Sequence, residues 1–202
     1  MPFSIAAANS MLDAVGITHL GALTDFPADS GAGTNEVTGG SYARQPVTYD
    51  AAAAKSKAKN ASPAVSIPIP AGTTVLFIGG WSALTVGSIR KWAPINGGSI
   101  KGVATVKNTG DVATSHAHGV VNNDRLFLMK ANNEAIPGGL AENILYHVVG
   151  ITADTFQVSL TSGGAAVAVT ADGEFAWQKL IPEVYGSAGN LDVSQDTLDL
   201  LG

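Results

Sequence analysis

Two histidines separated by one residue come closest to a chemical site in this sequence. His116 and His118 would share a face if their stretch is extended, because alternate residues of a strand point to the same side. Two imidazoles on one face can act as metal ligands, but a metal site needs more ligands. His147 could supply the third only if the fold brings it near. We interpret the pair first as structural, with a metal site or a pH-sensitive contact as alternatives, and predict no bound metal.

A stretch of turn-forming residues from 25 to 40 carries oxygen atoms that suit calcium. Asp25, Asp29, Asn35 and Glu36 all lie in it. The alternating acids and closing glutamate of an EF-hand are missing, however. The default interpretation is therefore a solvated loop with turns.

Glu36 and Arg44 are an acid and a base that flank a double glycine, Gly39 and Gly40. Glycines permit a tight turn, which would bring the two charges together. We predict a salt bridge across the turn, with a structural and not a catalytic role.

Aromatic side chains could form a platform on which sugars stack. Aromatic residues on alternating strands are more often core or subunit-contact anchors, and we favour that interpretation. Three are candidates for surface contact: Trp92, Tyr146 and Trp177. The remaining members of the set are Trp81, Tyr42, Tyr49 and Tyr185.

Catalytic patterns are missing from the sequence. It has no nucleophile elbow, no phosphate-binding glycine loop and no H-E-x-x-H pair. The paired acids Asp192 and Asp196 fall in a turn, with no partner base evident. We predict that the protein is not an enzyme and uses no cofactor.

The amino-acid composition limits the classes of partner that the protein is expected to bind. Charged residues make up 13% of the 202 residues and hydrophobic ones 46%, so much of the surface is expected to pack against other subunits. The net charge of −5 argues against nucleic-acid binding, which needs clustered cations. Without cysteines there are no disulfides. The longest apolar stretches, such as residues 73–80, are too short to span a bilayer, and residues 1–5 do not resemble a secretory signal.

Short strands dominate the expected elements. A helix over residues 5–16, capped by Ser4, is followed by strands at 17–24, 42–49, 65–69 and 73–78, of which 65–69 has the prolines of an edge strand. Turn signals at the spacing typical of a sandwich or barrel then separate further strands. These are expected at residues 102–107, 125–129, 145–150, 155–160, 165–170 and 174–178.

The sequence N-E-V-T-G-G-S-Y-A-R at residues 35–44 resembles a signature of small phage virion proteins, usually labelled tail fibre or minor tail proteins. A P-A-G-T-T turn at 70–74 and a tryptophan-bearing strand follow it in the order typical of that family. The resemblance implies an assembly or structural role for Asn35, Glu36, Gly39, Gly40, Tyr42, Arg44 and Trp81.

The closing motif of that family, G-x-L-x-V followed by L-x-L, occurs here about a hundred residues late, at 189–193 and 198–200. The segment between resembles a β-module found within phage tail proteins. We therefore predict a nested insertion, with residues 1–97 and 179–202 as a virion-docking base domain and 98–178 as a projecting module.

The expected fold is mainly β, with a sandwich-like or barrel-like base domain, a short N-terminal helix and a nested second β-module. The resemblance implies a tail-associated component of a bacteriophage virion. The alternatives are a capsid decoration or head-fibre protein and an adhesin that binds host-surface glycan. Low charge and proline-bearing edge strands favour a homo-oligomer, which we expect to be a trimer bound to other phage structural proteins in the tail or the capsid. Neither nucleic acid nor membrane insertion is expected.

Overall fold

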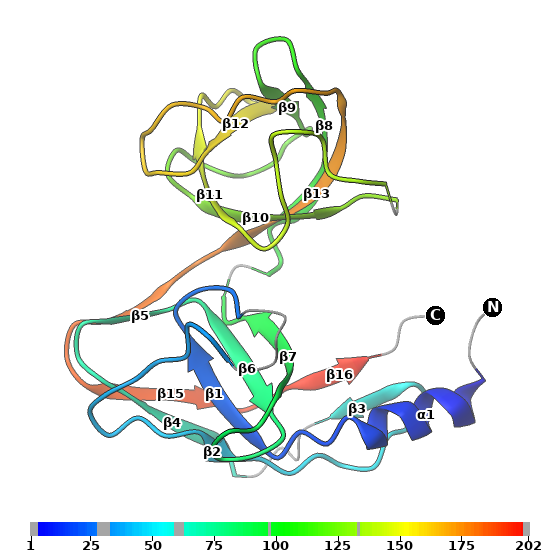
Figure 1. Ribbon diagram of the computed structural model, residues 1–202, viewed down its shortest axis with the longest axis vertical. Coiled ribbons are helices and arrows are strands. Elements are labelled where there is room, and N and C mark those ends of the chain that lie inside the picture. Colours follow the sequence, from blue (N-terminus) through cyan, green and yellow to red (C-terminus); the bar gives the residue numbers. More distant parts are fainter. Residues whose placement is uncertain (1–3, 28–32, 59–62, 97, 133, 200–202) are drawn as a thin grey trace. The chain divides into compact units, whose positions relative to one another are not determined.

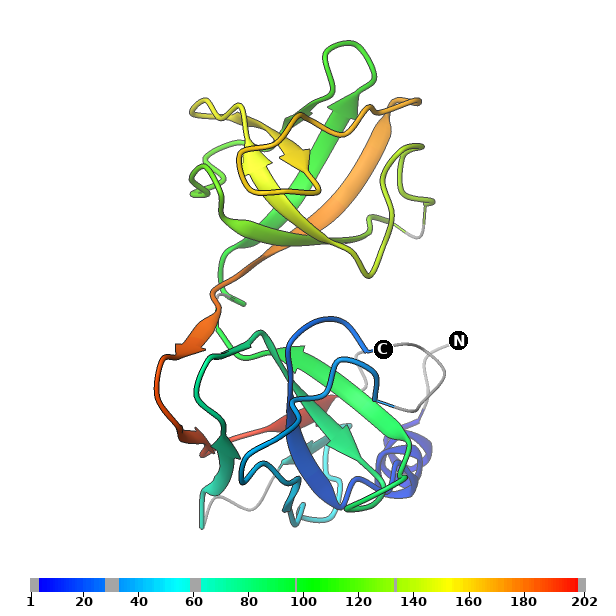
Figure 2. The same ribbon diagram turned by 60° about the vertical axis from the view of Figure 1, so that its left-hand side comes forward.

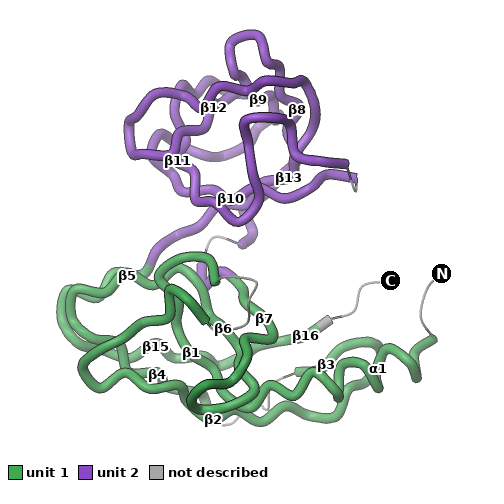
Figure 3. The backbone as a smooth tube through the Cα atoms, in the orientation of Figure 1, with its two compact units in different colours: residues 1–93, 183–202 green, residues 94–182 purple. Residues whose placement is uncertain are grey.

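The chain forms two compact units in the computed structural model, which describes residues 4–27, 33–58, 63–96, 98–132 and 134–199. Unit 1 comprises residues 1–93 and 183–202, and unit 2 comprises residues 94–182 (Figure 3). Unit 2 is therefore inserted into the sequence of unit 1. The expected fold class is confirmed, because sixteen strands accompany a single helix within the described residues (Figure 1). The docking and projecting roles of the two modules stay predictions.

The N-terminal helix forms where the sequence places it. Helix α1 spans Ile5–Ala14, and the Ser4 hydroxyl accepts a hydrogen bond of 3.2 Å from the Ala7 N–H. This cap satisfies one of the N–H groups that a helix start leaves without a partner. Ala8 and Leu12 are buried, so one face of the helix packs on unit 1.

The largest sheet of unit 1 has four strands in the order β2-β1-β6-β7. They span His19–Leu23 (β1), Gln45–Pro46 (β2), Phe77–Trp81 (β6) and Ile89–Pro94 (β7). Strand β6 is buried at all five positions and pairs antiparallel with β1, with His19 opposite Trp81. The strand expected at 42–49 is thus reduced to the two residues of β2.

Three two-stranded ladders complete unit 1, and in each the second strand comes from the chain after unit 2. The pairs are β3 (Ser56–Ala58) with β16 (Thr197–Asp199), β4 (Val65–Ile69) with β15 (Gly189–Val193), and β5 (Thr73–Val75) with β14 (Glu183–Tyr185). The closing motif of the sequence therefore forms β15 and β16. The segment that follows the insertion is an integral part of unit 1.

Unit 2 is a closed antiparallel barrel, seen from two sides in Figures 1 and 2. The order is β10-β11-β12-β9-β8-β13, and the barrel leaves no open sheet edge. Large aromatic side chains fill its interior: Tyr146, Phe156, Phe175 and Trp177. The strands span Lys101–Lys107 (β8), Val112–Thr114 (β9), Arg125–Lys130 (β10), Leu145–Val149 (β11), Thr155–Ser159 (β12) and Gly173–Leu180 (β13).

The strand predicted over residues 165–170 was wrong. Its backbone N–H groups donate to three separate places, so no ladder forms. Val167 donates to the Val158 carbonyl, Val169 to the Asp111 carboxylate and Thr170 to the Gly138 carbonyl. The alternating apolar residues of this segment reflect the burial of Val169 in the barrel core, and not strand pairing.

Candidate functional site

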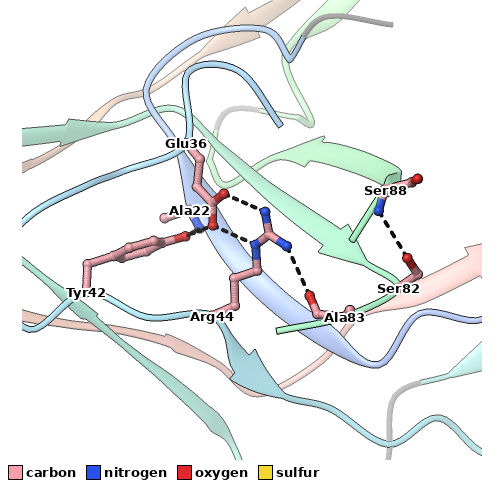
Figure 4. A network of polar contacts seen from close by, with 7 residues as sticks. All are labelled: Ala22, Glu36, Tyr42, Arg44, Ser82, Ala83 and Ser88. Carbon is pink, nitrogen blue, oxygen red and sulfur yellow. Dashed lines mark hydrogen bonds and ion pairs between the residues drawn. The ribbon is translucent and has the colours of Figure 1, made fainter. Parts of the chain in front are cut away.

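The signature residues converge on one carboxylate in unit 1 (Figure 4). Arg44 binds Glu36 through two parallel hydrogen bonds, Nε to Oε1 at 2.8 Å and Nη2 to Oε2 at 2.7 Å. The Tyr42 hydroxyl donates to Glu36 Oε1 at 2.8 Å and accepts from the Ala22 N–H of β1 at 3.1 Å. The predicted salt bridge between Glu36 and Arg44 is confirmed. It ties the loop after β1 to the sheet.

The indole ring of Trp81 packs against Arg44. The guanidinium carbon of Arg44 is 4.4 Å from the centre of this ring. The close approach depends on two glycines. A Cβ at Gly21 would come within 2.5 Å of the Tyr42 hydroxyl, and one at Gly79 within 2.4 Å of the indole. We call Glu36, Tyr42, Arg44 and Trp81 the signature network.

The remaining signature residues shape the backbone. Asn35 has a positive φ of 65°, and its amide donates to the Phe26 carbonyl at 2.6 Å. Gly39 and Gly40 also have positive φ values, 88° and 55°. Asparagine and glycine are the residues that tolerate this conformation. The sequence N-E-V-x-G-G-x-Y-x-R thus encodes a turn and the ion pair that holds it closed.

Burial raises the pKa of Tyr42 well above its usual range, and the negative charge of Glu36 raises it further. Tyr42 therefore keeps its proton and remains a donor to the carboxylate at any ordinary pH. With its bidentate arginine and its tyrosine donor, Glu36 has the partners of a structural anion.

The loop between β6 and β7, residues 82–88, is fixed by the signature network and by its own hydrogen bonds. Arg44 Nη1 donates to the Ala83 carbonyl at 3.0 Å. The Ser82 hydroxyl accepts from the Ser88 N–H at 3.1 Å, and the Ser82 N–H donates to the Ser88 carbonyl at 3.1 Å. The loop is held at its two ends and at Ala83.

A pocket of about 500 Å³ lies between this loop and the signature turn. Leu84 and Val86 at its rim are 50% and 101% exposed. Val86 also has a φ of 60°, which is unfavourable for a β-branched residue. The pocket is lined by Glu36, Val37, Thr38, Gly39, Tyr42, Ala43, Arg44, Leu84, Thr85 and Val86. Sequence reasoning missed the loop, although an apolar Leu-Thr-Val run beside a glycine was visible.

His116 and His118 do not share a face, because the chain turns between them at Ala117, which has a positive φ of 49°. The His116 side chain is 91% exposed, and its Nδ1 lies 2.7 Å from Asp154. His118 is 7% exposed; its Nδ1 accepts from the Val120 N–H, and its Nε2 contacts the Thr152 carbonyl at 3.2 Å. Both ring nitrogens of His118 therefore have structural partners.

Candidate calcium and metal ligands do not converge either. Asp25 accepts from the Phe26 N–H, Asn35 and Glu36 are engaged as described, and Asp29 lies outside the described residues. In the part of the chain that the structure describes, no three histidine, aspartate or glutamate side chains are placed to hold a metal ion.

Asp154 gives a pH-dependent expectation for this turn. The Ala117 N–H lowers the pKa of Asp154 below its ordinary value of 3.8, and His116 lowers it further. Since the folded pKa is below the unfolded one, the carboxylate stabilises the turn at higher pH, and this contribution is lost as pH falls through the folded pKa. A carboxyl NMR titration should place the Asp154 midpoint below 3.8. A midpoint at or above the midpoint of an unfolded peptide would contradict the contact, and Asp154→Asn is the control.

Two of the aromatic candidates for surface contact were wrong. Tyr146 and Trp177 are each 1% exposed, because β11 and β13 turn them into the barrel. Trp92 is half-buried in unit 1, with its ring edge-on to Phe26 and Phe77 at 5.2 and 5.3 Å. The core interpretation that we favoured for the aromatic set holds for these two barrel residues.

Asp196, for which the sequence showed no partner, binds two side chains of unit 1. The Lys91 ammonium and the Tyr49 hydroxyl both donate to its carboxylate, and Lys91 also donates to the Thr197 carbonyl at 3.0 Å. Lys91 lies 105 residues away, so only the fold brings the pair together. The ion pair attaches the segment before β16 to β7.

A family model described as podophage GP4 fiber I protein gp80 matches residues 6–123. The match covers the helix, the signature network and the pocket of unit 1, and extends into the barrel through β9. No curated protein and no solved structure matches the chain. Among the described residues, no helix has both the length and the apolar character needed to cross a membrane.

Proposed function

Because the chain belongs to the family of the podophage GP4 fiber I protein gp80, and is therefore a fibre-type structural protein of a phage virion, we propose that it is a tail-associated component. In this proposal unit 1 docks on the particle and unit 2 meets what lies outside it. The family match supports the assignment, since it includes every residue of the signature network and of the pocket.

The observation that carries the docking role is the exposed rim of the pocket. Leu84 and Val86 are exposed on a loop that three hydrogen bonds hold in place, one of them from Arg44. Val86 keeps a backbone conformation that costs about 1–3 kcal/mol, and such strain is most often maintained at functional sites. A rigid apolar rim beside a pocket matches the core of a protein interface.

The docking proposal is tested in assembled particles. Phage carrying Leu84→Asp with Val86→Asp should contain about tenfold fewer copies of the protein than wild-type phage, because a buried charge replaces apolar contact. The measurement is quantitative mass spectrometry of purified particles. Val103→Asp is the matched control, since it alters an exposed valine of unit 2. Normal incorporation of a folded double variant would contradict docking through this rim.

Labelling the protein in intact particles tests its location. A few labels at the tail are expected. Labels spread over the head in large numbers would contradict the tail assignment and favour the capsid decoration alternative. A homotrimer is part of the proposal, and the mass of the purified protein in solution checks it. Only monomer at micromolar concentration would count against self-assembly.

A further inference from the structure

Two polar side chains, Arg125 and His147, lie side by side on the outer face of the barrel, and Ser159, which is 1% exposed, continues their row under the adjoining loop. Arg125 of β10 lies opposite His147 of β11, and His147 lies opposite Ser159 of β12. Directly opposite residues of antiparallel strands have Cβ atoms about 4.5–5.5 Å apart. The neighbours Leu126 and Tyr146 belong to the barrel core, so the alternating residues of the row point outward.

Arg125 is half-buried, yet it forms no hydrogen bond or ion pair with any described residue. Two other cations that are shielded from water have a carboxylate partner: Arg44 binds Glu36, and Lys179 binds Asp124 at 2.7 Å. Taking a cation partly out of water without an anion is unfavourable. The guanidinium is therefore available to an external anion.

His147 adds a second polar group without a partner. Its Nδ1 is buried and has no hydrogen-bond partner among the described residues. Native proteins leave few buried polar atoms in this state, so the packing of the barrel alone does not account for this histidine. The ring is half-buried, which leaves Nε2 as the nitrogen that can face a ligand beside Arg125.

A polar loop, residues 160–164, borders the row. The Thr161 N–H donates to the Ser159 hydroxyl at 3.3 Å. The Ser162 hydroxyl and the Gly163 N–H both donate to the Asn123 side chain, at 3.0 and 2.8 Å. Hydroxyl and amide groups of this loop, held in place by these hydrogen bonds, thus border the row.

We propose that this row binds an anionic group, a carboxylate or a phosphate, carried by a surface saccharide. The planar guanidinium of Arg125 matches either anion with two parallel donors, and His147 contributes a third. The hydroxyl and amide margin suits the hydroxyls of a sugar ring, whereas a protein interface would need a larger apolar centre. The inference rests on the proposed role of unit 2 as the part that meets the outside. Residues 125, 147 and 159 all lie outside the family match.

Titration of the purified full chain with small saccharides, followed by NMR, tests the site. Glucuronic acid and glucose 1-phosphate should shift the signals of Arg125 and His147, and glucose should not. Arg125→Gln should weaken binding of the acidic sugars about tenfold or more, and Arg125→Lys should weaken it less. Lys101→Gln is the matched control, because Lys101 is an exposed cation of the same barrel and should leave binding unchanged. Added salt should also weaken binding.

The same titration contains the results that would overturn the proposal. These are an absence of shifts at Arg125 and His147 with both acidic sugars, equal shifts with glucose, or binding that Arg125→Gln leaves intact. Acetate or inorganic phosphate binding as tightly as the sugars would show an anion site without saccharide recognition. An acidic peptide that binds where neither sugar does would assign the site to a protein partner. Arg125→Gln should still enter particles, so failure here is distinct from failure of docking.

Discussion

Replacement of Arg44 by methionine should destabilise unit 1 by about 3–5 kcal/mol, the range for removing one partner of a buried ion pair. The variant leaves Glu36 with a charge in a site where its side chain is only 15% exposed. It also removes the guanidinium from the face of Trp81 and the donor to the Ala83 carbonyl. Both losses add to the cost of the unpaired carboxylate.

Denaturant unfolding followed by tryptophan fluorescence measures the effect, since Trp81 and Trp92 report on unit 1. Arg90→Met is the control, because Arg90 is exposed and should change stability by less than about 0.5 kcal/mol. The double variant Glu36→Gln with Arg44→Met should recover part of the loss, since no charge is left without a partner. A single variant as stable as wild type would contradict the network as the element that closes unit 1.

Replacement of Trp177 by alanine should destabilise unit 2 by about 3–5 kcal/mol. The indole is fully buried in the barrel, packs edge-on to Phe156 with centroids 5.8 Å apart and donates to the Ser115 hydroxyl at 3.2 Å. The cavity left by alanine lies between strands that close on themselves, so the walls can move little. A side chain that bound ligand on the surface would instead lose binding with little loss of stability.

Hydrogen exchange resolves the two units separately in this experiment. Amides of the barrel should lose protection in Trp177→Ala, while those of β1 and β6 should keep it. Trp177→Phe is the matched control, which retains an aromatic ring, lacks the indole donor and should lose clearly less stability. Unchanged protection of the barrel in the alanine variant would rule out the core role.

Local patterns in the sequence were sufficient for the elements whose signals are local. Ser4 caps α1 as expected, and β4 spans the residues that its pattern indicates, whereas the strand expected at 73–78 is divided between β5 and β6. The prediction of a strand at residues 165–170 was wrong because the partners of this segment are not determined by local sequence. Its alternation satisfies burial, but its N–H groups find partners that are distant in sequence, such as Asp111. Pattern alone does not distinguish an extended segment from a paired strand.

The candidate site likewise has one part that local spacing predicts and another part that it does not. The Glu36 and Arg44 pair spans eight residues and a double glycine, so its spacing was readable. The loop that Arg44 anchors is 39 residues away, and no local signal connects Arg44 with Ala83. The histidine pair looked promising only under the assumption of an extended chain, and one residue with positive φ, Ala117, removes that geometry. Backbone turns of this kind carry little sequence signal when no glycine is present.

The insertion of unit 2 also determines the order in which paired strands of unit 1 are synthesised. Strands β3, β4 and β5 leave the ribosome before residues 94–182, and their partners β14, β15 and β16 leave after them. At about 5–20 residues per second, that interval lasts on the order of 5–20 s. The barrel can fold during this time, while β3, β4 and β5 of unit 1 still lack their partner strands. A nascent chain can therefore complete unit 2 before the three two-stranded ladders of unit 1 close.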